Sequence, residues 1–340
     1  MKRTFSRRGQ QGMTIVELMV AMVLGLFVIG GFISVFISSL GAFRSNEGLA
    51  RIQENGRIGS ELMLREIRSA GGTACGTKLV SNVLGNPASA WWSDWALGSV
   101  RGVEGNQAFS GVTTGTATAQ RVVGTDLLVL LNTTAFDGVN ITGHNTSSAV
   151  IDIDVALPGI EVDDVLMVCD SLTAAMFQVS HLPGSAKIGH NAGIGTPGNC
   201  SKGLGYPPVC TTNGNQKSFI GGTVAKLDGS FWYVGNNGRG TRSLYRRVYD
   251  AAAPQEVVEG VHDLQIDYLR ADTASANALD ITWKTATEVG IAGWTDSAAE
   301  RVVAVRIQLT LMSNETVTTD AQRLERTFVH VVRLRNREVL

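Results

Sequence analysis

A long apolar run near the start of the sequence constrains the fold more than any other feature. From Met13 to Leu40 the chain holds 28 residues, and Glu17 is the only charged one. About 20 apolar residues are enough for a helix to cross the hydrocarbon core of a bilayer. The run is longer than the apolar core of a secretory signal peptide, and no obvious cleavage site ends it. The segment therefore predicts a membrane helix.

Glu17 is the residue that a plain membrane anchor does not explain. An acidic side chain inside a membrane segment costs roughly 2.5–3.5 kcal/mol on insertion scales, and such residues usually have a functional partner. A helix N-terminus offers partial positive charge, and a free α-amino group about one turn away would be a stronger partner. Cleavage between Gly12 and Met13 would create that group and make Glu17 the fifth residue of the mature chain.

The residues before the apolar run are basic. Residues 1–12 contain Lys2, Arg3, Arg7 and Arg8 and no acidic side chain. Positive charge next to a membrane helix favours the cytoplasmic side. The sequence therefore predicts a cytoplasmic leader and a single membrane pass, with the body of the chain on the periplasmic side.

A basic leader ending in Gly, followed by an apolar run with Glu at mature position five, resembles the class III signal of type IV pilins and pseudopilins. In that family a prepilin peptidase cuts after the Gly and methylates the new N-terminus. The resemblance implies a cleaved leader at 1–12, cleavage between Gly12 and Met13, and N-methylation of Met13. It also implies that Glu17 neutralises an N-terminal amine, its own or a neighbour's, in the fibre core. Met13 departs from the Phe that is common in the family.

Helical periodicity continues beyond Leu40. Apolar and small residues recur at spacings of three and four, which predicts a stripe that packs against the body. The Gly71-Gly72 pair is typical of a helix end. We expect one helix over 13–70, about 85 Å long at ~1.5 Å per residue, with 13–40 in the membrane. The predicted stripe contains Leu49, Ile52, Gly56, Gly59, Met63, Ile67 and Ala70.

The remainder, 71–340, is rich in Gly and in short runs of alternating apolar residues, which predicts strands joined by turns. Alternation predicts an antiparallel sheet with one solvated face. Together with the long helix this gives an α+β fold class of the type IV pilin kind. The expected strands are 121–131, 148–155, 164–169, 175–180, 231–234, 244–249, 264–268, 303–311 and 328–334.

Several pieces of the chain resemble the PilW family of minor pilins, in comparable order. The resemblance implies a protein that joins a priming complex with other minor pilins in the inner membrane, starts fibre polymerisation and then lies at or near the pilus tip. The implied partners are the prepilin peptidase, other minor pilins, the major pilin, the inner membrane and a tip adhesin. The pieces are GRIGSELMLREIRSAGGTACG, DVLMVCDSLTAAMFQVS, SLYRR, EVVEGVHDLQIDY, VVAVRIQLTLMS and VRLRNR.

Four cysteines in a body outside the cytoplasm predict disulfides, and four cysteines allow three connectivities. Cys200 and Cys210 share one loop rich in Gly and Pro, so we pair them. The remaining pair, Cys75 and Cys169, would join the end of the long helix to a strand. A zinc site is the alternative, but the cysteine spacings do not suit one.

No set of residues in the sequence indicates catalysis. The five histidines show no metal-binding spacing. Glu161, Asp163 and Asp164 lack the spacing of a calcium loop and predict a solvated turn. Trp91, Trp92 and Trp95 form a cluster that more often closes the edge of a core than binds a partner. We expect no cofactor, no metal and no enzyme activity, and the near-neutral net charge of −1 gives no reason to expect nucleic-acid binding.

Two other functions are compatible with parts of the sequence. A type II secretion pseudopilin of the GspJ kind would carry the same N-terminal signal, although the C-terminal pieces favour the pilus protein. A membrane-anchored periplasmic enzyme would need acid, base or metal residues that converge in a deep pocket.

Overall fold

The computed structural model describes residues 12–77, 79–156, 159–272, 279–295, 300–316 and 322–337. Residues 1–11 of the predicted leader lie outside the described residues. The chain divides into two compact units. The first contains residues 1–51 with 313–324, and the second contains 52–312 with 325–340.

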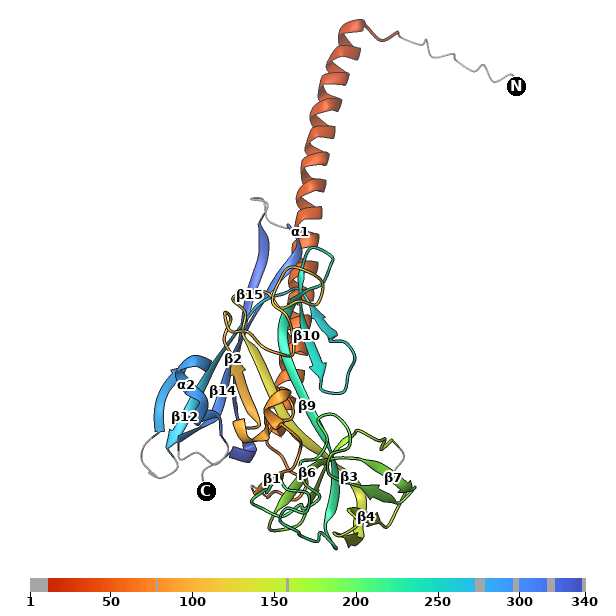
Figure 1. The fold of residues 1–340 in the computed structure, drawn as a ribbon. Coiled ribbons are helices and arrows are strands. Elements are labelled where there is room, and N and C mark those ends of the chain that lie inside the picture. Colours follow the sequence, from red (N-terminus) through yellow and green to blue (C-terminus); the bar gives the residue numbers. More distant parts are fainter. Residues whose placement is uncertain are drawn as a thin grey trace, which may run out of the picture. The chain divides into compact units, whose positions relative to one another are not determined.

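The N-terminal element is one helix, α1 (Ile15–Ser69), of 55 residues (Figure 1). Ile52, Met63 and Ile67 are buried within the second unit, as the predicted stripe requires. Gly56 lies against the ring of Phe328, where a side chain would not fit. The helix ends before Gly71, whose φ of 76° suits the left-handed position that glycine fills at helix ends. The predicted helix is thus present, with boundaries within two residues of those expected.

The larger sheet has eleven strands in the order β1-β6-β5-β9-β3-β4-β8-β7, with β10 and β11 branching from β9, and β2 from β3. Its pairs are antiparallel except for β1 and β6, which are parallel. The strands are β1 (Val80–Asn82), β2 (Val100–Val103), β3 (Leu127–Asn145), β4 (Val150–Ile153), β5 (Val165–Cys169), β6 (Ala174–Gln178), β7 (His181–Gly184), β8 (Lys187–Gly189), β9 (Thr223–Asn236), β10 (Arg242–Val248) and β11 (Gln255–Glu259).

The prediction of one solvated sheet face is wrong for the middle of this sheet. Every residue of β5 and of β6 is buried. Leu166 and Val168 of β5 pack into one apolar cluster with Phe177 and Phe219, whereas Met167 lies on the opposite face in a second cluster. A strand covered on both faces is apolar throughout instead of alternating, which is the pattern of these two segments.

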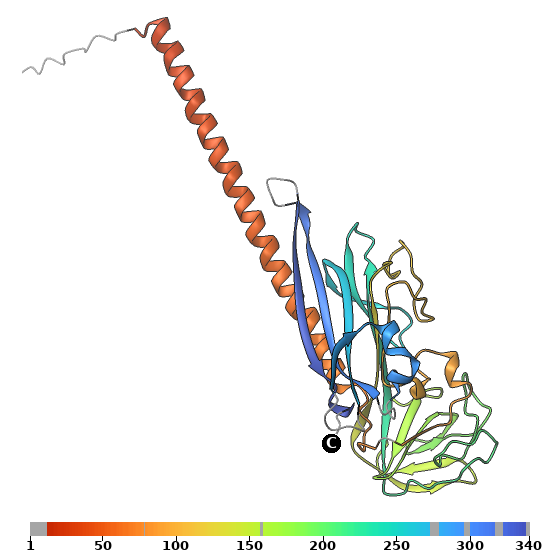
Figure 2. The same ribbon diagram turned by 90° about the vertical axis from the view of Figure 1, so that its left-hand side faces the viewer.

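The smaller sheet has four strands and follows the predicted alternation. Its order is β13-β12-β14-β15, formed by β12 (Val261–Asp272), β13 (Leu279–Lys284), β14 (Glu300–Thr316) and β15 (Arg323–Arg333). Val305, Ile307 and Leu309 of β14 are buried, as are Leu264 and Ile266 of β12. In both views this sheet (blue) and the β4–β7–β8 lobe (green) lie at different ends of the second unit (Figure 1 and Figure 2).

Short helices complete the body. α2 (Ala286–Trp294), which was not predicted from the sequence, begins with a capping box between Thr285 and Glu288. Gly290 has a non-helical backbone inside it. Three single-turn helices are η1 (Pro87–Ser89), η2 (Trp95–Leu97) and η3 (Arg335–Arg337).

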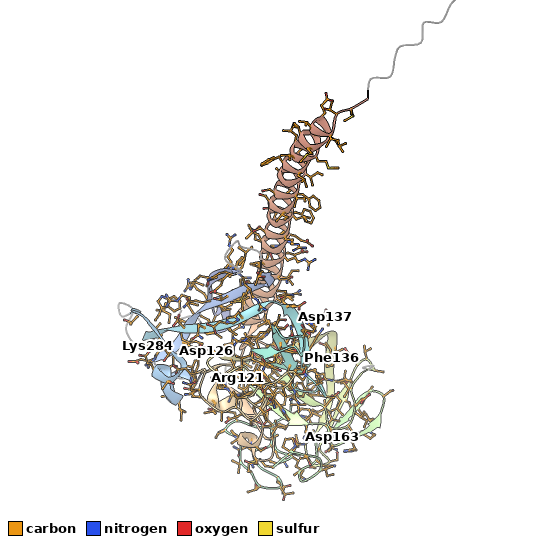
Figure 3. The ribbon with its side chains drawn as sticks, turned by 90° about the horizontal axis from the view of Figure 1, so that it is seen from above. Arg121, Asp126, Phe136, Asp137, Asp163 and Lys284 are labelled. Atoms are coloured by element: carbon orange, nitrogen blue, oxygen red, sulfur yellow. A yellow bond between two sulfur atoms is a disulfide. The ribbon has the colours of Figure 1, made fainter. Side chains whose placement is uncertain are left out.

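Asp126 bonds the larger sheet to the smaller one, and the buried Arg121 ties together the segments that precede β3 (both are labelled in Figure 3). Asp126 precedes β3, and its backbone N–H donates to the carbonyl of Leu264 in β12 at 2.8 Å. Its Oδ2 accepts a hydrogen bond from the backbone N–H of Ile266, also at 2.8 Å. Arg121 is fully buried and donates to backbone carbonyls of Thr125 and of the segment after β2. Its fixed fork of donors satisfies carbonyls that would otherwise lack partners.

Candidate assembly site

The residues predicted to act in assembly lie at the start of α1. Gly12 and Met13 are exposed and precede the helix, and Thr14 is its N-cap. The backbone N–H and the hydroxyl of Thr14 each donate to Oε2 of Glu17 at 3.2 Å, and the N–H of Glu17 donates to the Thr14 hydroxyl at 3.3 Å. This reciprocal arrangement is a capping box. It holds the Glu17 carboxylate beside the first peptide groups of the helix.

The rest of the segment around Glu17 is apolar and exposed on all sides of the helix. Every large apolar side chain from Met13 to Ile37 is exposed by 48% or more, the lowest value being that of Leu18. An 18-residue window of α1 has a mean hydropathy of 2.7 and no buried residue. By length and composition α1 could cross a membrane, and no other described helix could. A helix that is apolar all round suits lipid or the interior of a helix bundle.

A cluster of polar side chains joins the second half of α1 to the larger sheet. Oε2 of Glu66 accepts hydrogen bonds from the hydroxyl of Ser230 and from Nε1 of Trp232, both at 2.7 Å. Oε1 of the same carboxylate lies 2.5 Å from Nε of Arg246 in β10. The Glu66 carboxylate is about three-quarters buried, and Arg246 balances its charge. The cluster therefore fixes α1 against β9 and β10.

The end of α1 is held by a second set of bonds. The side-chain amide of Asn336 donates to the carbonyls of Ser69 and Ala70, at 3.3 and 3.0 Å. These are carbonyls that a helix C-terminus leaves without partners. The backbone N–H of Gly71 donates to the carbonyl of Leu131 in β3 at 2.8 Å. The helix end and the central strand of the body are therefore directly bonded.

Both disulfides have the pairing expected from the sequence. Cys75 and Cys169 are joined across 94 residues, with their Cα atoms 5.9 Å apart. Cys200 and Cys210 are joined across 10 residues, with their Cα atoms 4.9 Å apart. The first bond fixes the segment after α1 to β5, and the second closes a surface loop.

The structure brings two histidines together that the sequence analysis considered separately. Nε2 of His144 lies 3.0 Å from Nε2 of His190. Nδ1 of His144 accepts from the backbone N–H of Phe219, so the shared proton is on Nε2 of His144. Burial lowers the pKa of His144 to about 4 and that of His190 to about 3. The described residues contain no group of three or more metal-binding side chains, so the pair is a neutral polar contact in the core.

The tryptophans pack at the edge of the core, as the sequence favoured. Trp91 packs edge-on against Phe231 with ring centroids 4.9 Å apart, and Trp92 packs against Tyr249 at 5.3 Å. Trp95 is buried.

In the acidic turn Glu161 and Asp163 are exposed, whereas Asp164 is largely buried and pairs with Lys226 at 2.9 Å. The prediction of a solvated turn is therefore wrong for Asp164.

Two family models match the chain. The prokaryotic N-terminal methylation motif matches residues 7–33, and the model of type IV pilus-assembly protein W, PilW, matches residues 231–336. No curated protein and no solved structure matches the chain. The PilW match spans β10, β11, the four-stranded sheet and α2, while the methylation motif spans Gly12, Met13 and Glu17.

The long apolar helix, the β-sheet body and the methylation motif define a type IV pilin-like protein. Within this class the C-terminal match, over residues 231–336, is to PilW, which makes this part of the chain similar to the PilW family and supports a minor pilin role in the type IV pilus. The methylation motif and the PilW match imply processing by a prepilin peptidase and association with other pilins, and α1 is long and apolar enough to anchor the chain in a membrane.

Proposed function

We propose that this chain joins a priming complex of minor pilins in the inner membrane, which starts pilus polymerisation, and that it then lies at or near the fibre tip. One observation carries this proposal. Glu17 is the single charge in an otherwise apolar helix start that lies within the methylation motif. The PilW match favours this role over that of a type II secretion pseudopilin of the GspJ kind.

The proposed mechanism begins with cleavage of the Gly12–Met13 bond. The peptide nitrogen of Met13 then becomes an amine, one residue before the N–H that Glu17 bonds in the capping box. An ammonium within about 4 Å of a carboxylate is strongly attractive where water is scarce. Glu17 can then neutralise this amine or the amine of a neighbouring subunit. Since a charge without a partner is costly in an apolar bundle, the pair fixes the register of the helix.

In this account the protein is structural. Residues 1–12 are the cytoplasmic leader, 13–40 span the inner membrane, and 71–340 form the periplasmic head before entry into the pilus. The bond-breaking chemistry belongs to the prepilin peptidase, for which the chain is a substrate, and methylation modifies Met13. Other minor pilins, the major pilin and a tip adhesin are the proposed partners.

The test is Glu17→Val in a strain whose only copy carries the change. The variant should reach the membrane at the wild-type level, because the substitution makes the helix more apolar. Its amount in sheared pili, and the number of pili, should fall several-fold because the amine loses its partner. Ser34→Val changes the same helix without removing a charge and should leave piliation unchanged. Normal piliation with Glu17→Val would contradict the proposal.

A further inference from the structure

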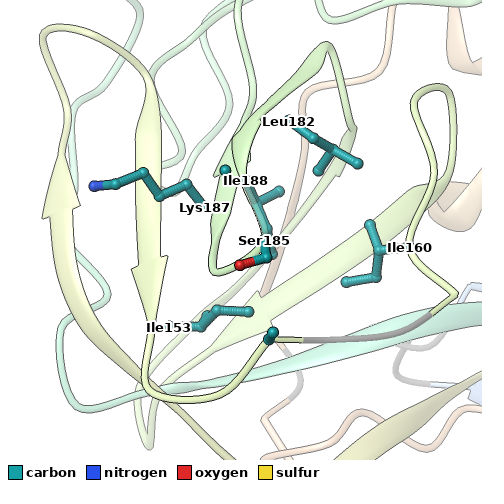
Figure 4. Close-up of a pocket in the computed structure, with 8 residues that line it drawn as sticks. Ile153, Ile160, Leu182, Ser185, Lys187 and Ile188 are labelled. Atoms are coloured by element: carbon teal, nitrogen blue, oxygen red, sulfur yellow. The ribbon is translucent and has the colours of Figure 1, made fainter.

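An apolar pocket opens on the lobe formed by β4, β7 and β8, in a part of the chain that neither family model covers. Its volume is about 550 Å³. Ile153 of β4, Ile188 of β8 and Ile160 line it, together with Leu182 of β7 (Figure 4). A pocket of this size is within the range of small-ligand sites and is large enough for one or two bulky side chains.

The base of the pocket is buried and its rim is apolar. Ile153, Ile160 and Ile188 belong to the buried cluster that also contains Phe177. Leu182 at the opening is 39% exposed. Val155, next in sequence to the lining residues, is 53% exposed. Concave apolar surface with an exposed apolar rim typically marks an interaction site.

The lining offers no charge to a ligand. The ammonium of Lys187 points away from the aliphatic side chains (Figure 4) and lies 2.5 Å from Oδ1 of Asp152. The remaining polar side chain of the lining is the hydroxyl of Ser185. A charged group in this pocket would lose its hydration without gaining a counter-charge. The pocket therefore suits an uncharged apolar group.

Acidic residues flank the lining segments of the pocket in sequence. Asp154, Glu161 and Asp163 are exposed and adjoin the lining segments in sequence. None of the three has an ion-pair partner among the described residues. Hydrogen bonds from Asn140 lower the pKa of Asp154 and so keep it ionised. This charge attracts a basic surface and repels the anionic headgroups of a bilayer.

We propose that this pocket binds an aliphatic or aromatic side chain of another protein subunit, carried on a segment with Lys or Arg next to it. The apolar side chain would fill the space between Ile153, Ile160 and Leu182. The basic neighbours would face Asp154 and Glu161. The lobe thus provides a docking site that is separate from the α1 surface used in fibre assembly.

The experiment is site-specific photo-crosslinking of the full-length protein in its native membranes. A benzoylphenylalanine replaces Leu182 at the rim of the pocket or, as the matched control, Leu172, an exposed leucine in the turn between β5 and β6. Peptides joined to the probe are identified by mass spectrometry. A second variant adds Ser185→Trp, which fills the pocket from an exposed position, and a third adds Asp154→Asn with Glu161→Gln. Thermal melting of each variant checks that the head is folded.

The proposal predicts that the probe at 182 joins one segment of one protein, with an apolar residue next to Lys or Arg, and that the probe at 172 does not. Ser185→Trp should reduce this product about tenfold, as blocking an interface anchor does. The double amide variant should reduce it several-fold, more at low salt than at high salt.

The proposal is overturned by a lipid adduct, by no adduct, by an adduct on a segment without basic residues, or by an adduct that persists in folded Ser185→Trp. Because the product is scored in membranes, the result does not depend on Glu17 or on whether pili form.

Discussion

Nε1 of Trp232 donates a hydrogen bond to Oε2 of Glu66 at 2.7 Å, and this bond joins α1 to β9. The same carboxylate pairs with Arg246 in β10. One side chain of the helix therefore contacts two neighbouring strands. These contacts fix the second half of α1 against the larger sheet.

The first prediction concerns this contact. Glu66→Ala removes two hydrogen bonds and the ion pair, and leaves Arg246 without this counter-charge. Unfolding free energy should fall by about 2–4 kcal/mol. Glu66→Gln keeps an acceptor and should cost less. Chemical denaturation of the detergent-solubilised protein measures both, with the exposed Glu54→Ala as a control that should change stability by less than about 0.5 kcal/mol. Equal stability of the Glu66→Ala and Glu54→Ala proteins would refute this role.

The second prediction concerns pH. Burial raises the pKa of Asp126 to about 6, and the nearby Glu104 acts in the same direction, while Arg121 and the N–H of Ile266 oppose the shift. Because the folded-state pKa lies above the unfolded one, near 4, the proton stabilises the folded state. That contribution is complete below about pH 4 and is lost as pH rises through 6.

Asp126→Asn removes this titration and keeps an acceptor for Ile266. The difference in unfolding free energy, variant minus wild type, should therefore increase between pH 4 and pH 7, by up to about 3 kcal/mol. Denaturant unfolding at several pH values measures it, and other titrating groups cancel in the difference. A difference that stays constant with pH would contradict the assignment.

The third prediction compares the disulfides. Closing a longer loop removes more entropy from the unfolded chain, and the loops span 94 and 10 residues. If this loss of entropy sets the stabilisation, the double variant Cys75→Ser, Cys169→Ser should be less stable than the double variant Cys200→Ser, Cys210→Ser. The expected difference in unfolding free energy is about 2 kcal/mol. Thermal unfolding of the two double variants tests the order. The reverse order would show that the loop near Cys200 supports the fold in some other way.

Local patterns were sufficient to predict the long helix and much of the smaller sheet. The alternation in β14 and the stripe from Ile52 to Ile67 each report a single buried face. The disulfide pairing was predictable because Cys200 and Cys210 share one loop. The capping box of Thr14 and Glu17 was also visible in the sequence as Thr-x-x-Glu, the signal that begins α2 at Thr285 as well.

Other features depend on contacts between distant residues. Glu66 and Trp232 are 166 residues apart. His144 and His190 meet because β3, which carries His144, pairs with β4, and β4 pairs with β8, which His190 follows. α2 was missed because Gly290 interrupts a short helix. β3 continues to Asn145 through polar residues that resemble a loop. The apolar cluster that contains Met167 forms because the second face of β5 is also covered. Which strands and loops cover that face depends on the order of the strands in the sheet, and the periodicity of a single strand does not reveal that order.

The fourth prediction concerns processing at Gly12. Gly12→Val places a branched side chain at the predicted cleavage bond, where the signal that this leader resembles has Gly. The leader should remain attached, and the protein should accumulate in the membrane without entering pili. Immunoblotting of membrane and sheared-pilus fractions measures this. The control is Gly59→Ala, which replaces a buried glycine of the same helix far from the cleavage bond. A variant that enters pili at the wild-type level would contradict the predicted site.

The most direct test of the central claim is the mass of the N-terminal peptide of the native protein from sheared pili. The account predicts a chain that begins at Met13, carries an N-methyl group, and retains Glu17 as its fifth residue. A peptide from that fraction that still contains residues 1–12 would contradict it, because the amine that is proposed to neutralise Glu17 would never have formed.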